Sequence, residues 1–256
     1  NSRPVTADYR MNDLAIVIPS RGRAGQVKTD ISGAVFWVRE EEVDDYRNAY
    51  PDREIIGHPP FANLATKRQA IYEHYGDVAM VDDDIEGVRR LWSPSGELPI
   101  YLTPDQARDL IQATYRAAIN ADCYLFGFSN YPNPKHYLPG KPIKMNGYIN
   151  GSAFGIRKSD SLYFTERTTA AESYWMTLLN AYAHRKAWID TRFCFAQAKA
   201  SLGRLSGGQT ANRTLGSERK DTIFLRRMFG PAIVLKPIRG ESANVHQYQR
   251  MVNIPL

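Results

Sequence analysis

Apolar and polar positions along the first 85 residues alternate in a pattern that predicts strands separated by helices. Continuous apolar runs, each ended by polar or turn-forming residues, predict buried strands at 14–18, 34–38, 53–56 and 77–81. A charged surface helix is expected over 40–50, and a second helix over 63–75 is expected to end at Gly76 as its C-cap. Units of this length predict an α/β fold, a mostly parallel sheet that is flanked by helices and binds ligands at the carboxyl ends of its strands.

The second half of the chain has a more mixed pattern. Thr103 as N-cap and Pro104 at the first helical position predict a helix that runs to about residue 121. The other expected elements are a strand at 123–129, a long ordered loop or flap over a site at 130–144, glycine-containing bent strands at 145–157, a helix at 172–186 and a flexible loop at 201–217. No position divides residues 1–256 convincingly, so we expect a single domain.

The composition is that of a folded protein with a sizeable core. Of the 256 residues, 43% are hydrophobic and 11% aromatic, which excludes a disordered, collagen-like or disulfide-scaffold protein. Cys123 and Cys194 lie among apolar and aromatic residues and are expected to be reduced and buried. No apolar run approaches the roughly 18 residues of a membrane span, and residues 1–9 are polar. We therefore expect a soluble protein of the cytoplasm, without a membrane partner.

Charge is unevenly distributed along the chain. The net charge is +6, but the segment from Arg185 to the C-terminus has 13 Lys and Arg against 4 Asp and Glu, whereas the residues before it are mildly acidic. A basic C-terminal third of this kind favours a polyanionic partner, either nucleic acid or a diphosphate. The alternative is a solvated basic surface without a specific partner.

The strongest chemical signal is the acidic triplet Asp82-Asp83-Asp84, directly after the strand predicted at 77–81. Adjacent carboxylates repel one another, so a chain keeps three of them at a strand end chiefly where a cation offsets the repulsion. Carboxylate oxygens favour Mg²⁺ or Mn²⁺ over zinc. Because side chains alternate along a strand, Asp82 and Asp84 are expected to face one side and Asp83 the other. The alternative is a solvated acidic turn, although apolar neighbours place the triplet next to the core.

The second signal is the turn Pro19-Ser20-Arg21-Gly22-Arg23 after the first strand. Its two arginines and backbone N–H groups are suited to a phosphate or a base edge at the first βα turn of such a sheet. The turn matches neither the phosphate-binding P-loop nor the Gly-x-Gly-x-x-Gly pattern. Lys67 and Arg68, predicted to lie off the apolar face of their helix, complete a cup for a nucleoside diphosphate that faces the metal. A solvated helix face is an equal alternative for this basic pair.

Together these motifs resemble the GT-A glycosyltransferases. The matching features are the strand and turn from Val17 to Arg21, the helix start from Asn63 to Arg68, the motif from Val81 to Asp84, Glu172-Ser173 at a helix start, and the late His246. The Ile-Pro-Ser-Arg-Gly-Arg start, the Asp triplet and the later Glu-Ser-Tyr-Trp resemble, more narrowly, the phage-type glycosyltransferases associated with TET/J-binding-protein-like pyrimidine hydroxylases. This resemblance, over roughly residues 13–190, implies a GT-A-like (Rossmann-like) fold with a nucleotide-sugar half over 13–100 and a mixed acceptor half over 101–256.

The resemblance also implies an activity and a set of site residues. The activity is metal-dependent transfer of a hexose or pentose from a nucleotide sugar, expected to be a UDP-sugar, to a hydroxyl group, above all that of a 5-hydroxymethylated pyrimidine such as hydroxymethylcytosine in DNA. Glu172 is the expected general base, and an ordinary helix-start glutamate is the alternative. The expected nucleotide-sugar ligands are Pro19, Ser20, Arg21, Arg23, Asn63, Lys67, Arg68, Asp82 and Asp83. The expected metal ligands, for Mn²⁺ or Mg²⁺, are Asp82, Asp84 and His246. The expected acceptor residues are Gly151, Ser152 and Trp175, together with Arg226 and Arg227, which are chosen from the basic C-terminal third.

Some roles and some functions stay open. His58 is a candidate for lining the nucleotide cup, and Tyr131, Tyr137 and Tyr148 are candidates for stacking on a flipped base, with core or lid packing as the alternative. A transferase acting on protein or glycan would share every motif except the need for a DNA-sized basic surface. A sugar nucleotidyltransferase usually has a longer glycine-rich first turn, and a non-catalytic DNA-binding module has little reason to keep three acids at a strand end.

Overall fold

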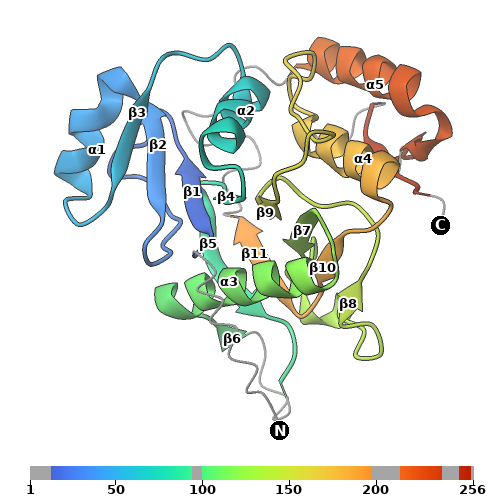
Figure 1. Cartoon of the computed structure of the whole chain (residues 1–256), viewed down its shortest axis with the longest axis horizontal. Helices are drawn as coiled ribbons and strands as arrows, with labels where there is room; N and C mark the ends of the chain where they lie inside the picture. Colours follow the sequence, from blue (N-terminus) through green and yellow to red (C-terminus); the bar gives the residue numbers. More distant parts are fainter. Residues whose placement is uncertain (1–12, 94–99, 198–213, 238–247, 255–256) are drawn as a thin grey trace, which may run out of the picture.

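The computed structural model describes residues 13–93, 100–197, 214–237 and 248–254 (Figure 1). An eight-stranded sheet has the order β3-β2-β1-β4-β9-β7-β10-β8. Its strands are β1 (Ala15–Pro19), β2 (Val35–Arg39), β3 (Ile55–His58), β4 (Val78–Val81), β7 (Leu125–Phe128), β8 (Ile143–Lys144), β9 (Ala153–Ile156) and β10 (Trp188–Asp190). The first four are parallel, β9 runs antiparallel to both β4 and β7, β10 is parallel to β7, and β8 is an antiparallel edge. The prediction of a mostly parallel α/β sheet with a mixed second half is confirmed.

The strands predicted in the first half pair in parallel because each is a short apolar run that can be buried on both faces. Val17 of β1 pairs with Val35 of β2 on one side and with Met80 of β4 on the other. All four residues of β4 are buried. The carboxyl ends of β1 and β4 therefore lie at the same edge of the sheet, where the arginine turn and the acidic triplet follow them.

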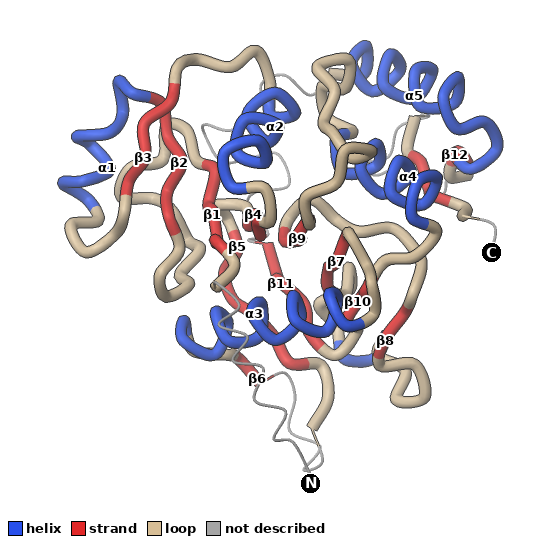
Figure 2. The backbone as a smooth tube through the Cα atoms, in the orientation of Figure 1, coloured by secondary structure: helices blue, strands red, loops and turns tan. Residues whose placement is uncertain are grey.

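Helices cover both faces of the sheet (Figure 2). On one face lie α2 (Leu64–Tyr75) and α4 (Glu172–His184). On the other lie α3 (Pro104–Asn120) and α1 (Val43–Ala49), which follows the short 3-10 helix η1 (Glu40–Glu42). Asn63 and Thr103 begin α2 and α3 with capping boxes, and Gly76 is the C-cap of α2. These predicted helix ends are confirmed.

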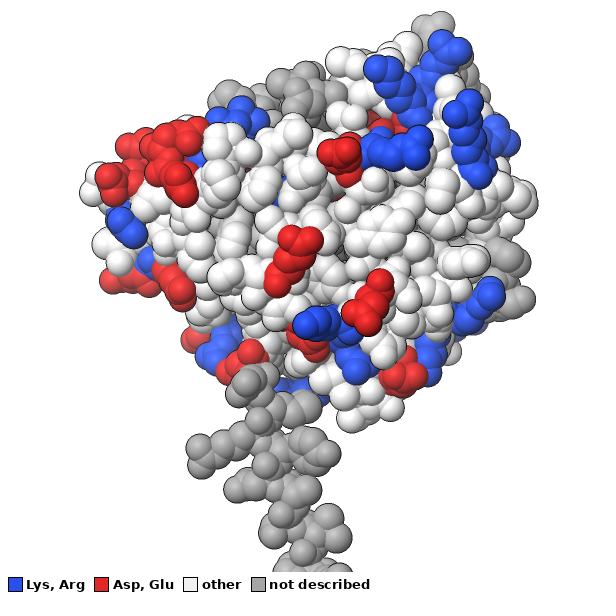
Figure 3. Space-filling view, turned by 45° about the horizontal axis from the view of Figure 1, so that its top comes forward, with Lys and Arg blue, Asp and Glu red and all other residues white. Residues whose placement is uncertain are grey.

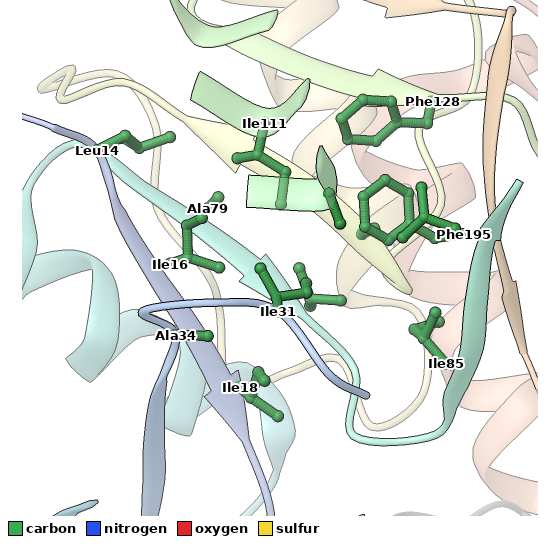
Figure 4. Packing of buried hydrophobic residues seen from close by; sticks show 14 of the residues in the cluster. Leu14, Ile16, Ile18, Ile31, Ala34, Ala79, Ile85, Ile111, Phe128 and Phe195 are labelled. Atoms are coloured by element: carbon green, nitrogen blue, oxygen red, sulfur yellow. The ribbon is translucent and has the colours of Figure 1, made fainter. Parts of the chain in front are cut away.

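The apolar core is divided between the two faces because neighbouring residues of a strand point in opposite directions. One cluster joins Ile16 and Ile18 of β1 to Ile111 of α3 (Figure 4). The other joins Val17 of β1 to Ile71 of α2. The continuous apolar run of β1 is thus explained, since both faces of the strand are buried.

The described residues also form two smaller sheets, neither of which was predicted from the sequence. In the first, β5 (Ile85–Arg90) pairs antiparallel with β11 (Phe193–Gln197) and β6 (Ile100–Tyr101). In the second, β12 (Ile233–Leu235), which follows the 3-10 helix η5 (Gly230–Ala232), pairs with β13 (Arg250–Val252). The turn between β4 and β5 contains the acidic triplet. Because β11 pairs with β5, the end of β11 lies beside this turn.

Helix α5 (Leu215–Phe229) corrects the flexible loop expected at 201–217. Thr214 is its N-cap, with a capping box to Ser217, so the last residues of the expected loop are the first turn of a helix. Residues 201–213 lie outside the described chain. Phe224 and Leu225 of α5 pack on Trp175 of α4.

Residues 130–144 contain more secondary structure than predicted, and residues 145–157 contain less. The expected loop at 130–144 contains the 3-10 helix η2 (Pro134–His136) and strand β8. The bent strands expected at 145–157 are reduced to β9, because residues 145–152 cross between β8 and β9 without ladder pairing.

Two expectations from composition can be compared with the described residues. Cys123 and Cys194 are both free and buried, as predicted. Among the helices that the structure describes, none has the length and apolar character needed to cross a membrane.

Candidate active site

The acidic triplet lies in a turn at the carboxyl edge of the parallel strands. The Asp82 N–H donates to the Ser152 carbonyl oxygen at 2.8 Å, and the Lys28 N–H donates to the Asp83 carbonyl oxygen at 2.9 Å. The Thr29 hydroxyl donates to the carbonyl oxygen of Asp82. Segments from both halves of the chain therefore fix the backbone from which the three carboxyl groups project.

Asp83 is buried and organises the arginine turn. Its carboxylate accepts hydrogen bonds from the Ser20 hydroxyl and from Arg23 Nη1. The Tyr46 hydroxyl lies 2.7 Å from the Ser20 hydroxyl and accepts from the Arg23 N–H at 3.1 Å. Burial raises the pKa of Asp83, and the hydrogen bond from Ser20 and the charge of Arg23 lower it. In this arrangement Ser20 and Arg23 are both hydrogen-bonded to Asp83.

Asp82 and Asp84 share a partner that Asp83 does not contact. The Gln197 side-chain nitrogen, at the end of β11, lies 3.5 Å from Asp82 Oδ2 and 3.3 Å from Asp84 Oδ1. Arg23 Nη1, which bonds to Asp83, also lies 4.0 Å from Asp84 Oδ2, so Asp84 lies near the partners of both neighbours and the expected division into two sides is seen only in part. The three residues follow β4 in a turn instead of continuing the strand. Burial raises the pKa of Asp82 to about 7; Arg68 opposes this shift and Asp84 adds to it.

The donor set of this turn fits a hard divalent cation. Asp82 and Asp84 each have a carboxylate oxygen near the same Gln197 side-chain nitrogen, and Mg²⁺ commonly takes one or two carboxylates together with substrate phosphates and water. Within the described parts of the chain, no group of three or more His, Cys, Asp or Glu side chains is placed to hold a metal ion. His246, the third expected ligand, lies outside the described residues.

Arg68 of α2 connects the acidic turn to the acceptor half. Its side chain is 1% exposed, and its guanidinium donates to Asp82 Oδ1 at 2.8 Å, to the Gly151 carbonyl oxygen at 2.8 Å and to Glu172 Oε1 at 3.2 Å. The predicted position off the buried face of the helix, and the alternative of a solvated face, are both wrong for this residue. Arg68 can be buried because Asp82 and the Gly151 carbonyl oxygen supply hydrogen-bond partners for its guanidinium.

Lys67 is buried beside Arg68 and faces the arginine turn. Its Nζ donates to the Ser20 carbonyl oxygen at 2.7 Å. Burial lowers the pKa of Lys67 to about 7, while the charge of Asp83 opposes the shift. Lys67 therefore lies at the carboxyl end of β1 as an amine that gains and loses its charge near neutral pH. The expectation that it lies off the apolar face is wrong for it too.

Glu172, the expected general base, is the first residue of α4 and is 8% exposed. Among the described residues, Arg68 is the one that donates to its carboxylate, through Oε1. At Gly151 a Cβ would lie 2.7 Å from Arg68 Nη1 and 3.3 Å from Glu172 Oε1. The space beside this glycine is therefore occupied by the protein's own side chains. The arrangement leaves Glu172 Oε2 to accept a proton.

The two arginines of the first turn have different surroundings. Arg21 is exposed, and no hydrogen bond joins its guanidinium to another described residue. Arg23 is buried against Asp83. Pro19 is the buried last residue of β1. Of the residues expected to bind the diphosphate from this turn, Arg21 is the one whose side chain is free to do so.

Asn63 and His58 have partners in the protein. Asn63 Oδ1 caps α2 by accepting from the Thr66 N–H at 2.9 Å, and its Nδ2 donates to the Glu166 carbonyl oxygen at 2.9 Å. His58 is buried, and its ring stacks on Trp37 with 6.2 Å between centroids. Burial lowers the pKa of His58 to about 4, so the ring is neutral at pH 7. Asn63 thus has a structural position, whereas His58 lies at the carboxyl edge as a neutral ring.

The expected acceptor residues do not lie together. Trp175 is 2% exposed, stacks on Phe224 at 5.3 Å and donates to the Tyr163 carbonyl oxygen at 2.7 Å. A stacking role on a base is therefore wrong for it, because the apolar contact between α4 and α5 covers its ring. Ser152 is buried next to Asp82 and Gly151. Arg226 and Arg227 are exposed on α5.

The three tyrosines differ in position. Tyr131 is exposed and Tyr137 is half-buried in the loop at 130–144. Tyr148 stacks on Tyr174 at 4.5 Å, and its hydroxyl lies 2.8 Å from the Ser173 hydroxyl. Of the three tyrosines, Tyr148 is therefore the one that contacts the residue next to Glu172, which is Ser173.

Three residues of the site were missed from the sequence: Gln197, Tyr46 and Thr29. Each lies far along the chain from the carboxyl group or backbone that it contacts, and each is of a common type in an ordinary element. No local signal distinguishes Gln197 from any polar residue at the end of a strand, so the antiparallel pairing of β5 with β11 alone reveals it.

Comparison with known proteins gives one match. The family described as TET-Associated Glycosyltransferase matches residues 14–200, which include the arginine turn, the acidic triplet, Arg68 and Glu172. The matched range ends before α5. No curated protein matches the chain.

Proposed function

The chain belongs to the TET-associated glycosyltransferase family, and from this we propose that it transfers a sugar from a UDP-sugar to the hydroxyl group of a 5-hydroxymethylated pyrimidine in DNA. The observation that carries the proposal is that Asp82 and Asp84 lie beside the same Gln197 nitrogen, with Arg68 joining this acidic turn to Glu172. A site of that kind has acidic ligands for a metal diphosphate on one side and a proton acceptor on the other.

The donor would bind at the carboxyl ends of β1 and β4. Arg21 has a free guanidinium there, and Lys67 supplies a second positive charge at the same edge. A guanidinium binds phosphate oxygens through two parallel N–H groups, which orients as well as attracts the diphosphate. Asp83, Ser20 and Arg23 support this proposal indirectly, since their mutual hydrogen bonds shape the turn that presents Arg21.

Asp82 and Asp84 are the residues that would hold Mn²⁺ or Mg²⁺. Such an ion neutralises the negative charge that develops on a departing diphosphate. The two side chains would bind it through Asp82 Oδ2 and Asp84 Oδ1, the oxygens that share Gln197. Arg68 would keep Asp82 oriented through its other oxygen, Oδ1.

Glu172 would take the proton of the acceptor hydroxyl. In a direct displacement, the hydroxyl oxygen forms the new bond to the anomeric carbon while the bond from that carbon to the diphosphate oxygen breaks, and its electron pair leaves with the diphosphate. The proton passes to Glu172, whose Oε2 accepts no hydrogen bond from the described residues. Arg68 holds the other carboxylate oxygen and so aims Oε2.

A DNA acceptor is supported by the outer surface of α5. The exposed charged residues of this helix are Arg219, Lys220, Arg226 and Arg227, whereas its two acids are buried. Figure 3 shows Lys and Arg side chains gathered over the end of the molecule that carries α5 and acidic side chains over the α1 end. A surface with one sign of charge suits a phosphodiester backbone.

The test is transfer of labelled sugar from UDP-glucose in the presence of Mn²⁺. Three reactions are compared: duplex DNA containing 5-hydroxymethylcytosine, the same duplex with cytosine, and water alone. We expect label on the hydroxymethylated duplex and slow hydrolysis in the other two. Equal release of UDP in all three, with no labelled DNA from UDP-glucose or UDP-galactose, would refute the DNA acceptor. Labelling of a protein or glycan instead would identify the alternative acceptor class.

A further inference from the structure

The backbone that leads into α4 is held by a residue of α5. α4 begins without a side-chain cap, because its N-cap residue is Ala171. The carboxylate of Asp221 accepts hydrogen bonds from the Thr169 N–H at 3.0 Å and from the Ala170 N–H at 2.8 Å. Asp221 is 0% exposed, so water does not compete for these bonds. A buried carboxylate thus fixes the two amides directly before the N-cap, where α4 has no polar side chain of its own.

We propose that Asp221 is a positioning residue for Glu172, a role that rests on the proposed function of Glu172 as general base. Ala170 lies two residues before Glu172, so its hydrogen bond to Asp221 fixes the point and direction at which α4 starts. Arg68 holds the other end of the Glu172 side chain at 3.2 Å. Glu172 is therefore restrained from both sides, by its backbone through Asp221 and by its carboxylate through Arg68.

The restraint has to be tight because the space around Glu172 is small. Gly151 lies so close that a Cβ would come within 3.3 Å of Glu172 Oε1. A displacement of about 1 Å between reacting groups can cost about 100-fold in rate. A small rotation of the first turn of α4 would move Oε2 by such an amount without unfolding the helix.

α5 is itself fixed in place, so that Asp221 can act as a rigid support. Arg250 of β13 pairs with Glu218 Oε2 at 2.9 Å, and its Nη1 donates to the Thr222 hydroxyl at 2.7 Å. Both members of the ion pair are almost completely buried. α5 lies beyond the residues that the family matches, 14–200, so this support comes from a part of the chain outside the matched range.

The substitution to test is Asp221→Asn, with Glu218→Gln as the matched control. Both remove a buried carboxylate from the inner side of α5, but Asp221 accepts from the Thr169 and Ala170 amides, whereas Glu218 pairs with Arg250 of β13. With UDP-glucose, Mn²⁺ and hydroxymethylcytosine DNA, we expect Asp221→Asn to lower kcat 10- to 100-fold and to leave KM for UDP-glucose within twofold. Glu218→Gln should lower the melting temperature at least as much, with kcat within threefold.

A double substitution separates positioning from general stability. If Asp221 acts through Glu172, adding Asp221→Asn to Glu172→Gln should change the residual rate less than twofold. The inference would be overturned if Asp221→Asn lowered the rate by the same factor in the unchanged protein and in Glu172→Gln. It would also be overturned if Asp221→Asn and Glu218→Gln lowered kcat equally. A near-normal kcat for Glu172→Gln would refute the base and the inference together, whereas a large loss there with normal Asp221→Asn would refute the inference alone.

Hydrogen exchange gives a readout that needs no substrate. Asp221→Asn should speed exchange of the amides at 169–175, while those of the donor half, 13–93, stay as in the unchanged protein. If the protein transfers no sugar to hydroxymethylcytosine DNA, the proposed function fails. Unchanged exchange at 169–175 would still show that Asp221 does not hold the start of α4 and would overturn the inference.

Discussion

Replacing Gly151 by alanine tests how closely Arg68 and Glu172 are packed. The new Cβ would lie 2.7 Å from Arg68 Nη1, 3.2 Å from Ser173 Cβ and 3.3 Å from Glu172 Oε1. The first separation is too short for a real contact, so the guanidinium has to move. Arg68 is 1% exposed and bonded to Asp82 and Glu172, and it has no open space to move into without stretching one of these contacts.

The expected magnitudes follow from this crowding. Forcing an additional methyl group into a packed, buried site costs about 1–3 kcal/mol. For a protein of this size the melting temperature falls by roughly 2–4 °C per kcal/mol, so we expect Gly151→Ala to lower it by about 2–12 °C. Because the methyl group separates Arg68 from Glu172, we expect kcat for sugar transfer to fall about 10- to 100-fold.

The measurements are thermal unfolding and sugar transfer at saturating UDP-glucose. Gly216→Ala is the control, since the nearest atom to its Cβ would be Thr214 Oγ1 at an ordinary 3.7 Å, and the residue lies in the first turn of α5. This control should leave the melting temperature unchanged or slightly raised. Wild-type stability and kcat in Gly151→Ala would show that Arg68 and Glu172 can separate freely, which would refute the close packing argued for the site.

The remaining predictions address the metal, the donor and the acceptor. Asp84→Asn should abolish Mn²⁺-dependent transfer and leave the fold intact because it relieves carboxylate repulsion; full activity of this variant in EDTA would contradict a metal-dependent reaction. Arg21→Ala should weaken UDP binding at least tenfold by calorimetry, since a hydrogen bond from a charged group contributes about 1.5–3 kcal/mol, with no change in melting temperature because Arg21 is exposed. Without a divalent metal, UDP binding should weaken as the pH rises through about 7, because Lys67 loses its positive charge and Asp82 gains a negative one there; a flat profile from pH 6 to 8 would contradict both contributions. Replacing Arg226 and Arg227 by Gln should reduce the salt dependence of duplex binding by about one unit of slope for each lost phosphate contact and spare UDP-glucose hydrolysis; equal loss of both would argue against DNA contact by α5.

The sequence alone determined the first half of the fold. The apolar patterns are short and regular in β1, β2, β4 and α2. A continuous apolar run predicts a strand buried on both faces, and a periodic one predicts a helix buried on one face. Asn63 and Gly76 mark the ends of α2 through hydrogen bonds and backbone conformations that involve only near neighbours in the chain. The acidic triplet could also be recognised from the sequence, because three adjacent carboxylates repel one another whatever the surrounding fold.

The tertiary structure decided which charged residues are buried and which face solvent. Arg68 and Lys67 read as polar positions of a helix, but partners far along the chain, at Gly151 and Ser20, supply the hydrogen bonds that make their burial possible. Trp175 shows the converse case. Its pattern is equally compatible with a binding surface, and only the packing of α5 on α4 covers it.

The same distinction applies to the site as a whole. The sequence indicated Asp82, Asp84 and Glu172, because residue type and position next to a strand or helix end limit what such acids do. It did not indicate Gln197 or Asp221, which lie 115 residues from Asp82 and 51 residues from Ala170. Their partners are chosen by how β5 pairs with β11 and how α5 packs on α4, and no local pattern encodes a contact that forms only when distant elements meet. Composition and spacing thus determined the chemistry available to this protein, whereas long-range packing decided the geometry in which that chemistry is held.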